Sequence, residues 1–358
     1  MKRILSIFTV FILFFSTLIS ATGCVDPDET KEYTTRSRTV SYQHFNTVTI
    51  ISTYGDTTED EFNNYVEITD EMFGYYHKLF DIYYEYSGVN NIKTINRQAG
   101  KSPVQVDEEL IDFLLYCKEL YTLTNGKTNI MLGSVLSIWH DVREEATDMG
   151  GILLDKESLP TEEDLRKAAE HTSIDSLVIN KEEGTVYISD REASIDVGAI
   201  AKGYAASRLA ERLKAEGADS MAINAGGNIV TIGLKPDGGQ WVTGITNPDK
   251  TAENSLICRV KVGETALVTS GDYERYFICD GVAYHHIIDP DTLMPANYFS
   301  SVSIFTADSG LADALSTALF CMSYEEGLAL IESIGGADAL WIYKDGSIKY
   351  TEGISFVD

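Results

Sequence analysis

The sequence predicts an α+β fold in which antiparallel sheets are flanked by helices. Short runs rich in β-branched residues, separated by Gly, Asp and Asn turns, fill the second half of the chain. A few longer segments interrupt those runs and carry apolar residues at three- and four-residue spacing, which is typical of amphipathic helices. The hairpin-like spacing of the runs favours antiparallel pairing over a doubly wound sheet, in which strands and helices would alternate.

The amino-terminal end is typical of an exported protein. Lys2 and Arg3 precede an apolar run, Ile4 to Ile19, which is shorter than the about 20 residues that a membrane-spanning helix needs. We predict a signal peptide over residues 1–23. The Ala-Thr-Gly before Cys24 resembles the lipobox of bacterial lipoproteins, so we expect lipidation of Cys24 and an extracytoplasmic body anchored to the bacterial cell membrane. A secretory signal with an incidental cysteine is the alternative.

The remaining chain divides into a tether and a folded body. Residues 24–39 are too poor in apolar side chains to bury a core and are predicted to be flexible. Residues 40–358 are numerous enough for a large core, and we expect two lobes.

The first half of the body is predicted to hold one strand and two long helices. Val48 to Thr53 alternates loosely as a strand. A long amphipathic helix is expected between Thr58 and Tyr86, and its tyrosine-rich face is interpreted as core. Asp107 is predicted to cap a second helix, which ends before the Asn125-Gly126 turn.

Strands dominate the second half. The predicted strands are Leu177–Asn180, Thr185–Ile188, Met221–Asn224, Trp241–Thr246, Leu256–Val262, Leu267–Thr269, Arg275–Cys279 and Ser301–Thr306. The predicted helices are Glu162–His171, Ile200–Glu216, Leu311–Met322 and Tyr324–Ile334.

Charge and cysteine content narrow the classes of function. A formal net charge of −27 repels nucleic acid, so no nucleic-acid partner is expected. A phosphate-bearing ligand would need a local cation or aimed backbone amides, although the acidity also serves solubility. The four cysteines after Cys24 are interpreted as buried apolar residues, and a Cys258–Cys279 disulfide is left open.

The segment Ser194 to Tyr204 carries the first chemical signal. A predicted strand turns through small residues into a helix whose first turn bears Lys202, and helix N-termini attract phosphate. Taken alone, Asp196 would read as a helix cap and Lys202 as a solvated side chain. The run is, however, very similar to the D-x-G-G-I-A-K-G-Y signature of the ApbE family.

Further segments resemble the same family in the same order. In the second half they are Asn224–Ile229 (N-x-G-G-x-I), Val268–Phe277 (T-S-G-D-Y-x-R-Y-F), His285–Pro290 (H-I-I-D-P) and Ala312–Leu319 (D-A-L-S-T). The first half agrees more loosely: Phe45-Asn46-Thr47 replaces Met-Gly-Thr, Ser87 to Asn96 is similar to S-x-L-S-x-x-N, and Lys127-Thr128-Asn129 replaces Ala-Phe-Asp.

The resemblance implies an activity, a fold and a set of partners. It implies a T-fold-like, two-lobed body with FAD and a metal between the lobes. The implied reaction is Mg2+-dependent transfer of FMN from FAD to a threonine hydroxyl of an acceptor protein, with release of AMP. The acceptor is expected to be, for example, a subunit of a membrane redox complex. This chain lacks the acceptor pattern Asp-x-x-T-G-A-[ST] itself, so self-modification is not expected.

The metal ligands follow from the resemblance together with helix geometry. Asp313 and Thr317 are four residues apart on a predicted helix and hence lie on one face. The resemblance makes them the Mg2+ ligands and adds the backbone carbonyl of Ala199. Oxygen donors of these kinds suit Mg2+. Ser316 stands where some family members have a second acid.

The resemblance also implies a binding set for FAD and a base. Tyr83 is expected to stack on a ring of the cofactor, Lys202 to meet phosphate, Asp196 to meet polar groups of the nucleotide, and Ile287 to contact the flavin. His286 is the candidate base or leaving-group partner. The full set of implied cofactor-binding residues is Phe45, Tyr83, Lys127, Thr128, Asn129, Asp196, Lys202, Ser270, Gly271 and Ile287.

Two other functions remain open at this point. The same pocket with water as the nucleophile would make a Mg2+-dependent FAD pyrophosphatase, which releases FMN and AMP. A non-catalytic flavin-binding lipoprotein is the second alternative, but it gives no reason for a pair of metal ligands at Asp313 and Thr317.

Overall fold

A large antiparallel sheet organises the fold. The computed structural model describes residues 34–41, 44–153 and 155–357, which belong to one compact unit. The predicted signal peptide, Cys24 and most of the predicted tether lie outside these ranges. The strand order is β1-β2-β7-β8-β11-β14-β15-β16, and every neighbouring pair is antiparallel. The strands of this sheet are β1 (Thr35–Ser41), β2 (Thr49–Tyr54), β7 (Met221–Ala225), β8 (Asn228–Ile232), β11 (Ala266–Gly271), β14 (Ser301–Thr306), β15 (Ala337–Ile342) and β16 (Ile348–Tyr350).

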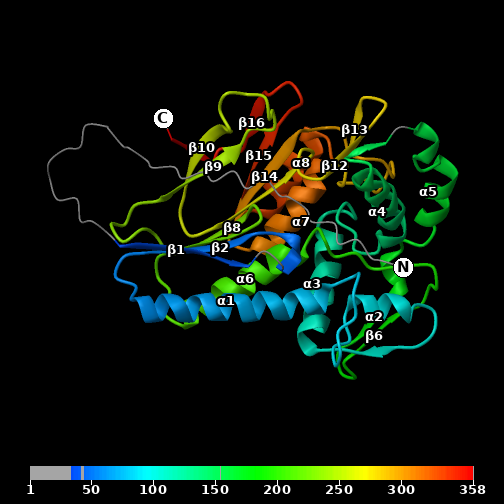
Figure 1. Cartoon of the computed structure of the whole chain (residues 1–358), viewed down its shortest axis with the longest axis horizontal. Helices are drawn as coiled ribbons and strands as arrows, with labels where there is room; N and C mark the ends of the chain where they lie inside the picture. The colour runs from blue at the N-terminus through cyan, green and yellow to red at the C-terminus, as the bar shows by residue number, and fades with distance from the viewer. Residues whose placement is uncertain (1–33, 42–43, 154, 358) are drawn as a thin grey trace, which may run out of the picture. The chain divides into compact units, whose positions relative to one another are not determined.

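Three small sheets surround the large one (Figure 1). Their orders are β17-β10-β9, β13-β12-β4 and β3-β6-β5, and the β12–β4 pair is parallel. The strands are β3 (Val104–Gln105), β4 (Ile152–Leu153), β5 (Leu177–Asn180), β6 (Thr185–Ile188), β9 (Trp241–Thr246), β10 (Leu256–Val262), β12 (Tyr276–Cys279), β13 (Val282–His285) and β17 (Ser355–Phe356). The predicted α+β class with antiparallel sheets is confirmed.

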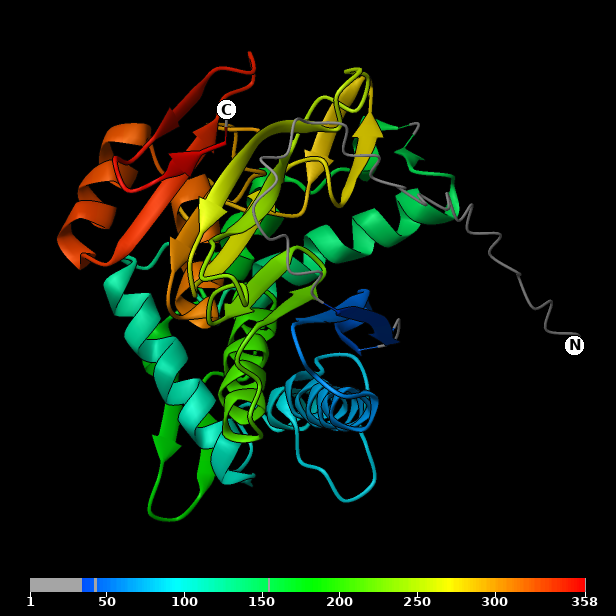
Figure 2. The same ribbon diagram turned by 90° about the vertical axis from the view of Figure 1, so that its left-hand side faces the viewer.

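Eight α-helices are present in the described residues. They are α1 (Glu59–Phe80), α2 (Ile92–Arg97), α3 (Glu108–Leu123), α4 (Gly133–Asp148), α5 (Glu162–Ala169), α6 (Ala201–Ala215), α7 (Ser309–Phe320) and α8 (Tyr324–Ile334). Short 3-10 turns lie at η1 (His44–Asn46), η2 (Lys156–Ser158) and η3 (Ile174–Ser176). Figure 2 views α1 nearly end-on, with β1 beside it.

The two faces of the large sheet have different cover. Helix α7 packs on β11 and β14, and α6 packs on β7 and β8. Along β11, Val268 belongs to the apolar cluster of α7, whereas Leu267 belongs to a cluster with Trp241 and Val260 of the β9–β10 sheet. This alternation is what a strand buried on both faces requires. Helices therefore cover one face of these strands, and a small sheet covers the other.

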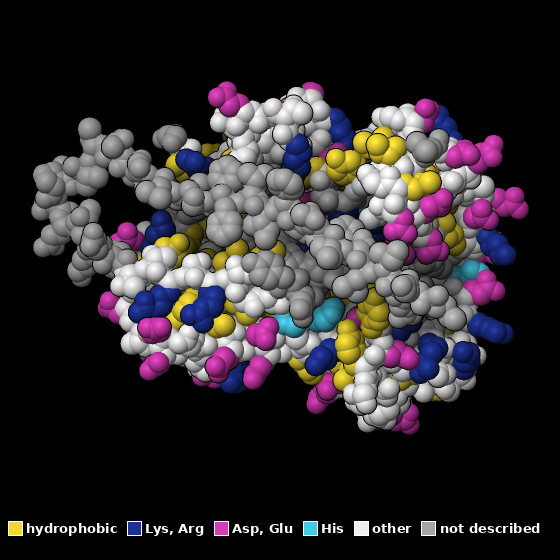
Figure 3. Space-filling model, in the orientation of Figure 1, with side chains coloured by type: hydrophobic (Ala, Val, Ile, Leu, Met, Phe, Trp, Pro, Cys, Tyr) yellow, Lys and Arg dark blue, Asp and Glu magenta, His cyan; other side chains and the backbone are white. Residues whose placement is uncertain are grey.

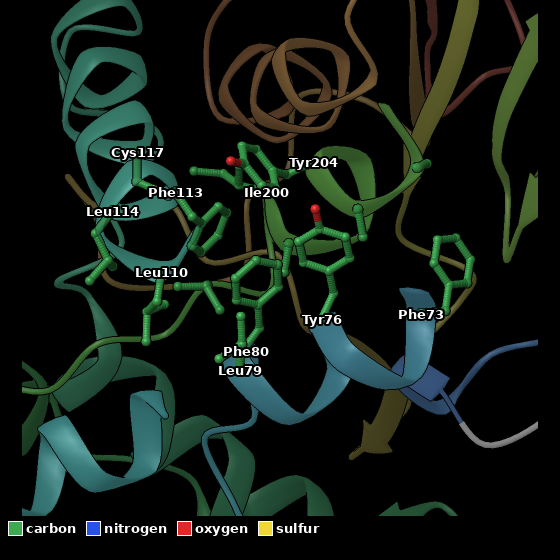
Figure 4. Close-up of a cluster of buried hydrophobic side chains, with 14 of the residues drawn as sticks. Phe73, Tyr76, Leu79, Phe80, Leu110, Phe113, Leu114, Cys117, Ile200 and Tyr204 are labelled. Atoms are coloured by element: carbon green, nitrogen blue, oxygen red, sulfur yellow. The ribbon is translucent and has the colours of Figure 1, made fainter. Parts of the chain in front are cut away.

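Aromatic side chains of α1, α3 and α6 form the core beneath α6 (Figure 4). The rings of Phe80 and Phe113 stack with centroids 4.0 Å apart, and Tyr204 meets Phe113 edge-on at 4.9 Å. Tyr76 is buried and its hydroxyl donates to Glu109. The interpretation of the tyrosine-rich face of α1 as core is confirmed for Tyr76, whereas Tyr75 stays exposed.

Several element boundaries differ from the sequence expectation. β1 begins at Thr35, inside the predicted tether of residues 24–39, because its polar residues pair with β2 as an edge strand. The first long helix ends at Phe80 rather than Tyr86. There the Asp81 carboxylate accepts the amides of Tyr83 and Tyr84, which competes with helix continuation. The sequence left a Cys258–Cys279 disulfide open; in the structure the four cysteines of the described residues are free, namely Cys117, Cys258, Cys279 and Cys321.

Gly203 sets the approach of α6 to α7. A Cβ at this position would lie 2.1 Å from the Ser309 carbonyl oxygen and 2.7 Å from the Asp313 Cβ. Such distances cannot be accommodated without moving one helix. The glycine therefore lets α7 bring Asp313 against the first turn of α6.

We predict that Gly203→Ala destabilises the fold by roughly 1–3 kcal/mol, since the added methyl overpacks the α6–α7 contact. Urea unfolding measures this loss. Gly263→Ala is the matched control, because a Cβ there meets only Leu234 Cδ2 at 3.9 Å. Equal stability of the two variants would contradict the assigned role of Gly203.

Candidate functional site

Hydrogen bonds from two other parts of the chain fix the segment that enters α6. The side chain of Asn96 accepts the Ile195 amide at 2.8 Å and donates to the Ile195 carbonyl at 2.9 Å. The Asp196 amide donates to the Ile130 carbonyl at 2.8 Å. Residues 194–196 are thus held between α2 and the loop before α4, which orients the turn that follows.

Asp313 lies buried where α7 meets the start of α6. Its Oδ2 accepts the Gly203 amide at 2.9 Å, and this amide belongs to the first turn of α6. Burial raises the pKa of Asp313, and the nearby charge of Lys202 offsets part of that increase. Lys202 Nζ donates to Asn228 Oδ1 at 3.0 Å. A buried carboxylate in this setting is stabilised by further positive charge.

Hydroxyl groups line the next turn of α7. Ser270 Oγ lies 2.8 Å from Ser316 Oγ and 3.5 Å from Thr317 Oγ1, and Ser316 donates to the Asp313 carbonyl oxygen at 2.9 Å. Gly271 is buried beside Ser270. Ser316 is committed to these bonds, whereas the Thr317 hydroxyl has, within the described residues, only the long contact to Ser270. We call Asp313, Thr317, Lys202, Asn228 and Ser270 the Asp313 cluster.

The Ala199 carbonyl has no donor in the described part of the chain. In a continuous helix the amide four residues later would donate to it, but the Gly203 amide donates to Asp313 instead. The bond that holds the carboxylate therefore also frees a carbonyl oxygen in the turn just before α6.

These oxygen donors fit Mg2+. A carboxylate, a hydroxyl and a carbonyl are hard ligands, and Mg2+ commonly completes its shell with water and substrate oxygens. Among the described residues, the Gly203 amide bonds Asp313 through Oδ2, the Thr317 hydroxyl has one long contact, and the Ala199 carbonyl has no donor. No group of three or more His, Cys, Asp or Glu side chains that could hold a metal occurs in residues 34–41, 44–153 and 155–357.

His286 belongs to a second cluster, which also contains Tyr83, His140, Arg143 and Asp196; we call it the His286 cluster. A small pocket beside the His286 ring is also lined by His140 and Arg143 of α4. Tyr83 Oη lies 3.2 Å from His140 Nδ1, and the two rings are nearly parallel with centroids 6.2 Å apart. Tyr83 is 49% exposed, so its ring is available to a ligand.

Burial and neighbouring cations keep His286 neutral. Burial lowers its pKa to about 3, and the charges of Arg275 and Arg143 act in the same direction. Its amide donates to the Arg275 carbonyl, and its Nδ1 is buried with no hydrogen-bond partner among the described residues. A neutral imidazole with an unused nitrogen can accept a proton or meet a ligand.

The side chains of residues 127–129 all bond to other groups of the protein. Lys127 Nζ lies 2.9 Å from Asp289 Oδ1 and also pairs with Asp291. Thr128 Oγ1 donates to the Ala314 carbonyl of α7 at 2.7 Å, and Asn129 Nδ2 donates to the Thr172 carbonyl at 2.9 Å. Thr128 ties the loop before α4 to α7, and contact of the three residues with a nucleotide stays a prediction.

Ile287 and Phe45, two further residues of the predicted binding set, pack against other side chains of the protein. Ile287 is 5% exposed and packs in the apolar cluster of α7, so flavin contact through it also stays a prediction. Phe45 has a positive φ of 54° and meets Phe73 and His77 edge-on. The Thr47 that follows packs against Gly226, where a Cβ would lie 1.8 Å from Thr47 Oγ1.

A larger cavity than the pocket beside His286 lies elsewhere. It measures about 690 Å3 and is lined by α1, the loop 88–90 and the entry to α3, including Asp70, Tyr75 and Asp107. None of the predicted site residues lines it. We place the site at the Asp313 cluster and the His286 cluster because both combine charged groups with polar atoms that have no partner among the described residues. The side chains around this cavity are mainly surface side chains.

Sequence reasoning missed Asn228, His140 and Arg143 as site residues. Asn228 lies in the N-x-G-G-x-I segment, but only the fold places its amide between Lys202 and Asp313. His140 and Arg143 are three residues apart on α4. Their spacing would have indicated one helical face, but the helix itself was not predicted. Its start carries no sequence signal, because Leu132 at the N-cap makes no side-chain hydrogen bond.

Comparisons with known proteins agree on one family. The model of the ApbE family matches residues 45–341. An FAD:protein FMN transferase of Treponema pallidum (strain Nichols) is 35% identical over 279 residues, which cover 74% of this chain and 73% of that protein. One of Klebsiella pneumoniae (strain 342) is 29% identical over 260 residues, covering 72% and 77%.

Solved structures agree with the fold. The ApbE protein of Thermotoga maritima superposes with a TM-score of 0.74 at 28% identity, covering 90% of this chain and 97% of that one. A flavin transferase ApbE of Vibrio cholerae superposes with a TM-score of 0.70 at 24% identity, covering 89% and 96%, which is a likeness of fold.

Proposed function

Because the chain belongs to the ApbE family, we propose that it is an FAD:protein FMN transferase. Its similarity to relatives of that name supports the activity. The observation that carries the proposal is the Asp313 cluster together with the Ala199 carbonyl. The buried Asp313 carboxylate accepts an amide of the first turn of α6 beside Lys202, the Thr317 hydroxyl lies one turn further along α7, and the Ala199 carbonyl has no donor among the described residues. That arrangement suits a diphosphate with a divalent cation.

In the proposed reaction a hydroxyl oxygen of an acceptor threonine attacks the FMN-side phosphorus of FAD. A new P–O bond to the threonine forms, the P–O bond to the AMP phosphate breaks, and AMP leaves with the electron pair of that bond. Bound Mg2+, held by Asp313, Thr317 and the Ala199 carbonyl, would neutralise charge on the diphosphate oxygens.

The residues of this chain supply the remaining functions. Lys202 adds positive charge at the start of α6, where the helix dipole also favours phosphate. His286 is neutral at pH 7 and takes the proton of the attacking hydroxyl, or assists the leaving group. The negative charge of bound FAD opposes the effect of Arg143 and Arg275. It therefore raises the pKa of His286 from about 3 towards the working pH, where general acid–base catalysis is most effective. Tyr83, paired with His140, offers a ring to the flavin.

The test is an incubation of the mature chain with FAD, Mg2+ and a flavin-acceptor domain. In-gel fluorescence of the acceptor, with an added FMN mass, is expected. Free FMN and AMP without acceptor labelling would favour the pyrophosphatase. FAD binding without turnover, unaffected by a chelator or by Asp313→Ala, would favour the non-catalytic binder.

Removal of the metal gives a further prediction. We expect chelation to abolish transfer and added Mg2+ to restore it, because the buried Asp313 and the FAD diphosphate otherwise repel each other. Acceptor fluorescence with and without EDTA measures this. Transfer at an unchanged rate after chelation would contradict the metal site, even if the transferase activity itself is real.

Membrane attachment at Cys24 is also proposed, on the strength of its lipobox-like context. No helix within the described residues is long and apolar enough to span a membrane. Expression in a bacterium with labelled fatty acid is expected to label the wild-type chain and to leave Cys24→Ser unlabelled and released from membranes. Membrane retention of Cys24→Ser would argue for another anchor.

A further inference from the structure

Arg143 on α4 is a half-buried cation without a partner. Its guanidinium forms no side-chain hydrogen bond and no ion pair with any residue in the ranges that the structure describes, although the chain has 55 acidic residues against 28 basic ones. Figure 3 shows Asp and Glu side chains spread over one face of the molecule. Burial lowers the pKa of Arg143, but a guanidinium stays charged near neutral pH. A partly desolvated charge of this kind is costly unless a ligand meets it.

The groups around Arg143 point to an anion. Arg143 and His140 line the same small pocket as His286, whose buried Nδ1 also has no partner among the described residues. Arg275, in the loop before β12, adds a second guanidinium, which forms no ion pair with any described residue. Asp196 and Glu144 are the nearby acids that act on Arg143, but neither side chain forms an ion pair with it within 4 Å.

The position of this charge selects the kind of anion. In the proposed function His286 stands next to the attacking hydroxyl, so an anion beside His286 is the phosphoryl group under attack. A guanidinium offers a planar pair of donors that matches two phosphate oxygens. Lys202 lies on α6 and Asp313 on α7, whereas Arg143 lies on α4 and lines the pocket of His286.

We propose that Arg143 is a catalytic residue that binds the FMN phosphoryl group of FAD and stabilises its charge during transfer, with Arg275 assisting from the rim. This inference rests on the proposed function and names the group of this chain that meets the transferred phosphorus. It predicts that the phosphate of a flavin, rather than its ring, is the part that Arg143 recognises.

The first test needs no turnover. Binding of FMN and of riboflavin, which lacks the phosphate, is measured by flavin fluorescence for the wild type, Arg143→Gln and Arg143→Lys. Arg143→Gln is expected to weaken FMN binding about 10- to 100-fold, the range for a lost charge-assisted hydrogen bond, and to leave riboflavin binding unchanged. Arg143→Lys is expected to lie between, since it keeps the charge and loses the planar fork. Equal weakening of both ligands, or of neither, would overturn the proposal.

The second test uses the transferase assay. Arg143→Gln is expected to lower kcat about 10- to 1000-fold, with the wild-type unfolding temperature retained. Arg166→Gln on α5, an exposed pair with Glu162, is the control and is expected to keep full activity. A loss confined to the KM for the acceptor protein would assign Arg143 to acceptor binding and overturn the phosphoryl contact. If the wild type transfers no FMN at all, the proposed function fails, while the FMN and riboflavin comparison still decides the contact.

The third readout separates a charge effect from a merely structural one. Arg275, Arg143 and the adjacent His285 all lower the pKa of His286, and His140 lines the same pocket. Removing the Arg143 charge therefore raises the pKa of His286, and the acid limb of the pH profile of kcat should move to higher pH in Arg143→Gln. An acid limb at the wild-type position would contradict a charge beside His286.

Discussion

Asp313→Asn is expected to lower kcat/KM for FMN transfer by roughly 1000-fold, the scale of losing a main electrostatic contact at a transferring phosphoryl group. Asparagine keeps the size of the side chain and an oxygen for the Gly203 amide, but it removes the negative charge that holds a cation. Acceptor fluorescence measures the loss over a range of Mg2+ concentrations. Excess Mg2+ is expected to recover only part of the rate.

Stability separates this loss from misfolding. The pKa of Asp313 is raised by burial, so its charged form costs free energy of folding at neutral pH when no cation is present. Asp313→Asn is therefore expected to be at least as stable as the wild type in EDTA. Mg2+ with FAD should raise the unfolding temperature of the wild type and of the exposed control Asp345→Asn, but not that of Asp313→Asn. Wild-type activity of Asp313→Asn would contradict the proposed metal site.

His286→Gln is expected to lower kcat about 100- to 10,000-fold, the range for losing general acid–base assistance, while FAD still binds. The acid limb of the pH profile should disappear with the imidazole. His171→Gln, which loses an ion pair at the surface with Asp190, is the control and should keep its activity. A drop in FAD affinity with unchanged kcat would reassign His286 to binding.

The same histidine contributes to the pH dependence of stability. The folded pKa of His286 is about 3, below the ordinary value of 6.5, so the unfolded chain binds a proton there more readily than the folded chain. The stabilisation from the neutral ring is fully present above pH 6.5 and is lost as the pH falls towards 3. The free energy of unfolding, measured with urea, should fall more between pH 7 and pH 5 for the wild type than for His286→Gln.

Local patterns predicted much of the fold. The β-branched runs at Trp241–Thr246, Leu256–Val262 and Ser301–Thr306 match β9, β10 and β14, because a run of this kind between turn residues has few other low-energy arrangements. Boundaries depended on side-chain bonds that periodicity does not encode, as with Asp81 at the end of α1. Helix α4 was missed because it begins at Gly133 without a capping side chain, so its start carries no local signal.

The candidate site, like the fold, could be predicted from the sequence only in part. Four-residue spacing on a predicted helix placed Asp313 and Thr317 on one face, but only the family resemblance made them metal ligands. The contact of Asp313 with Gly203 joins residues 110 positions apart, and the roles of Asn228 and Arg143 arise only from such tertiary contacts. Lys127 could not be judged from its segment, since its partner Asp289 comes from a distant part of the chain.

A crystal structure of the mature chain with FAD and Mn2+, located by its anomalous scattering, tests the central claim most directly. The account predicts one cation bonded to the Asp313 carboxylate, the Thr317 hydroxyl, the Ala199 carbonyl and the diphosphate of FAD. A diphosphate bound away from α6 and α7, with no cation at Asp313, would contradict it.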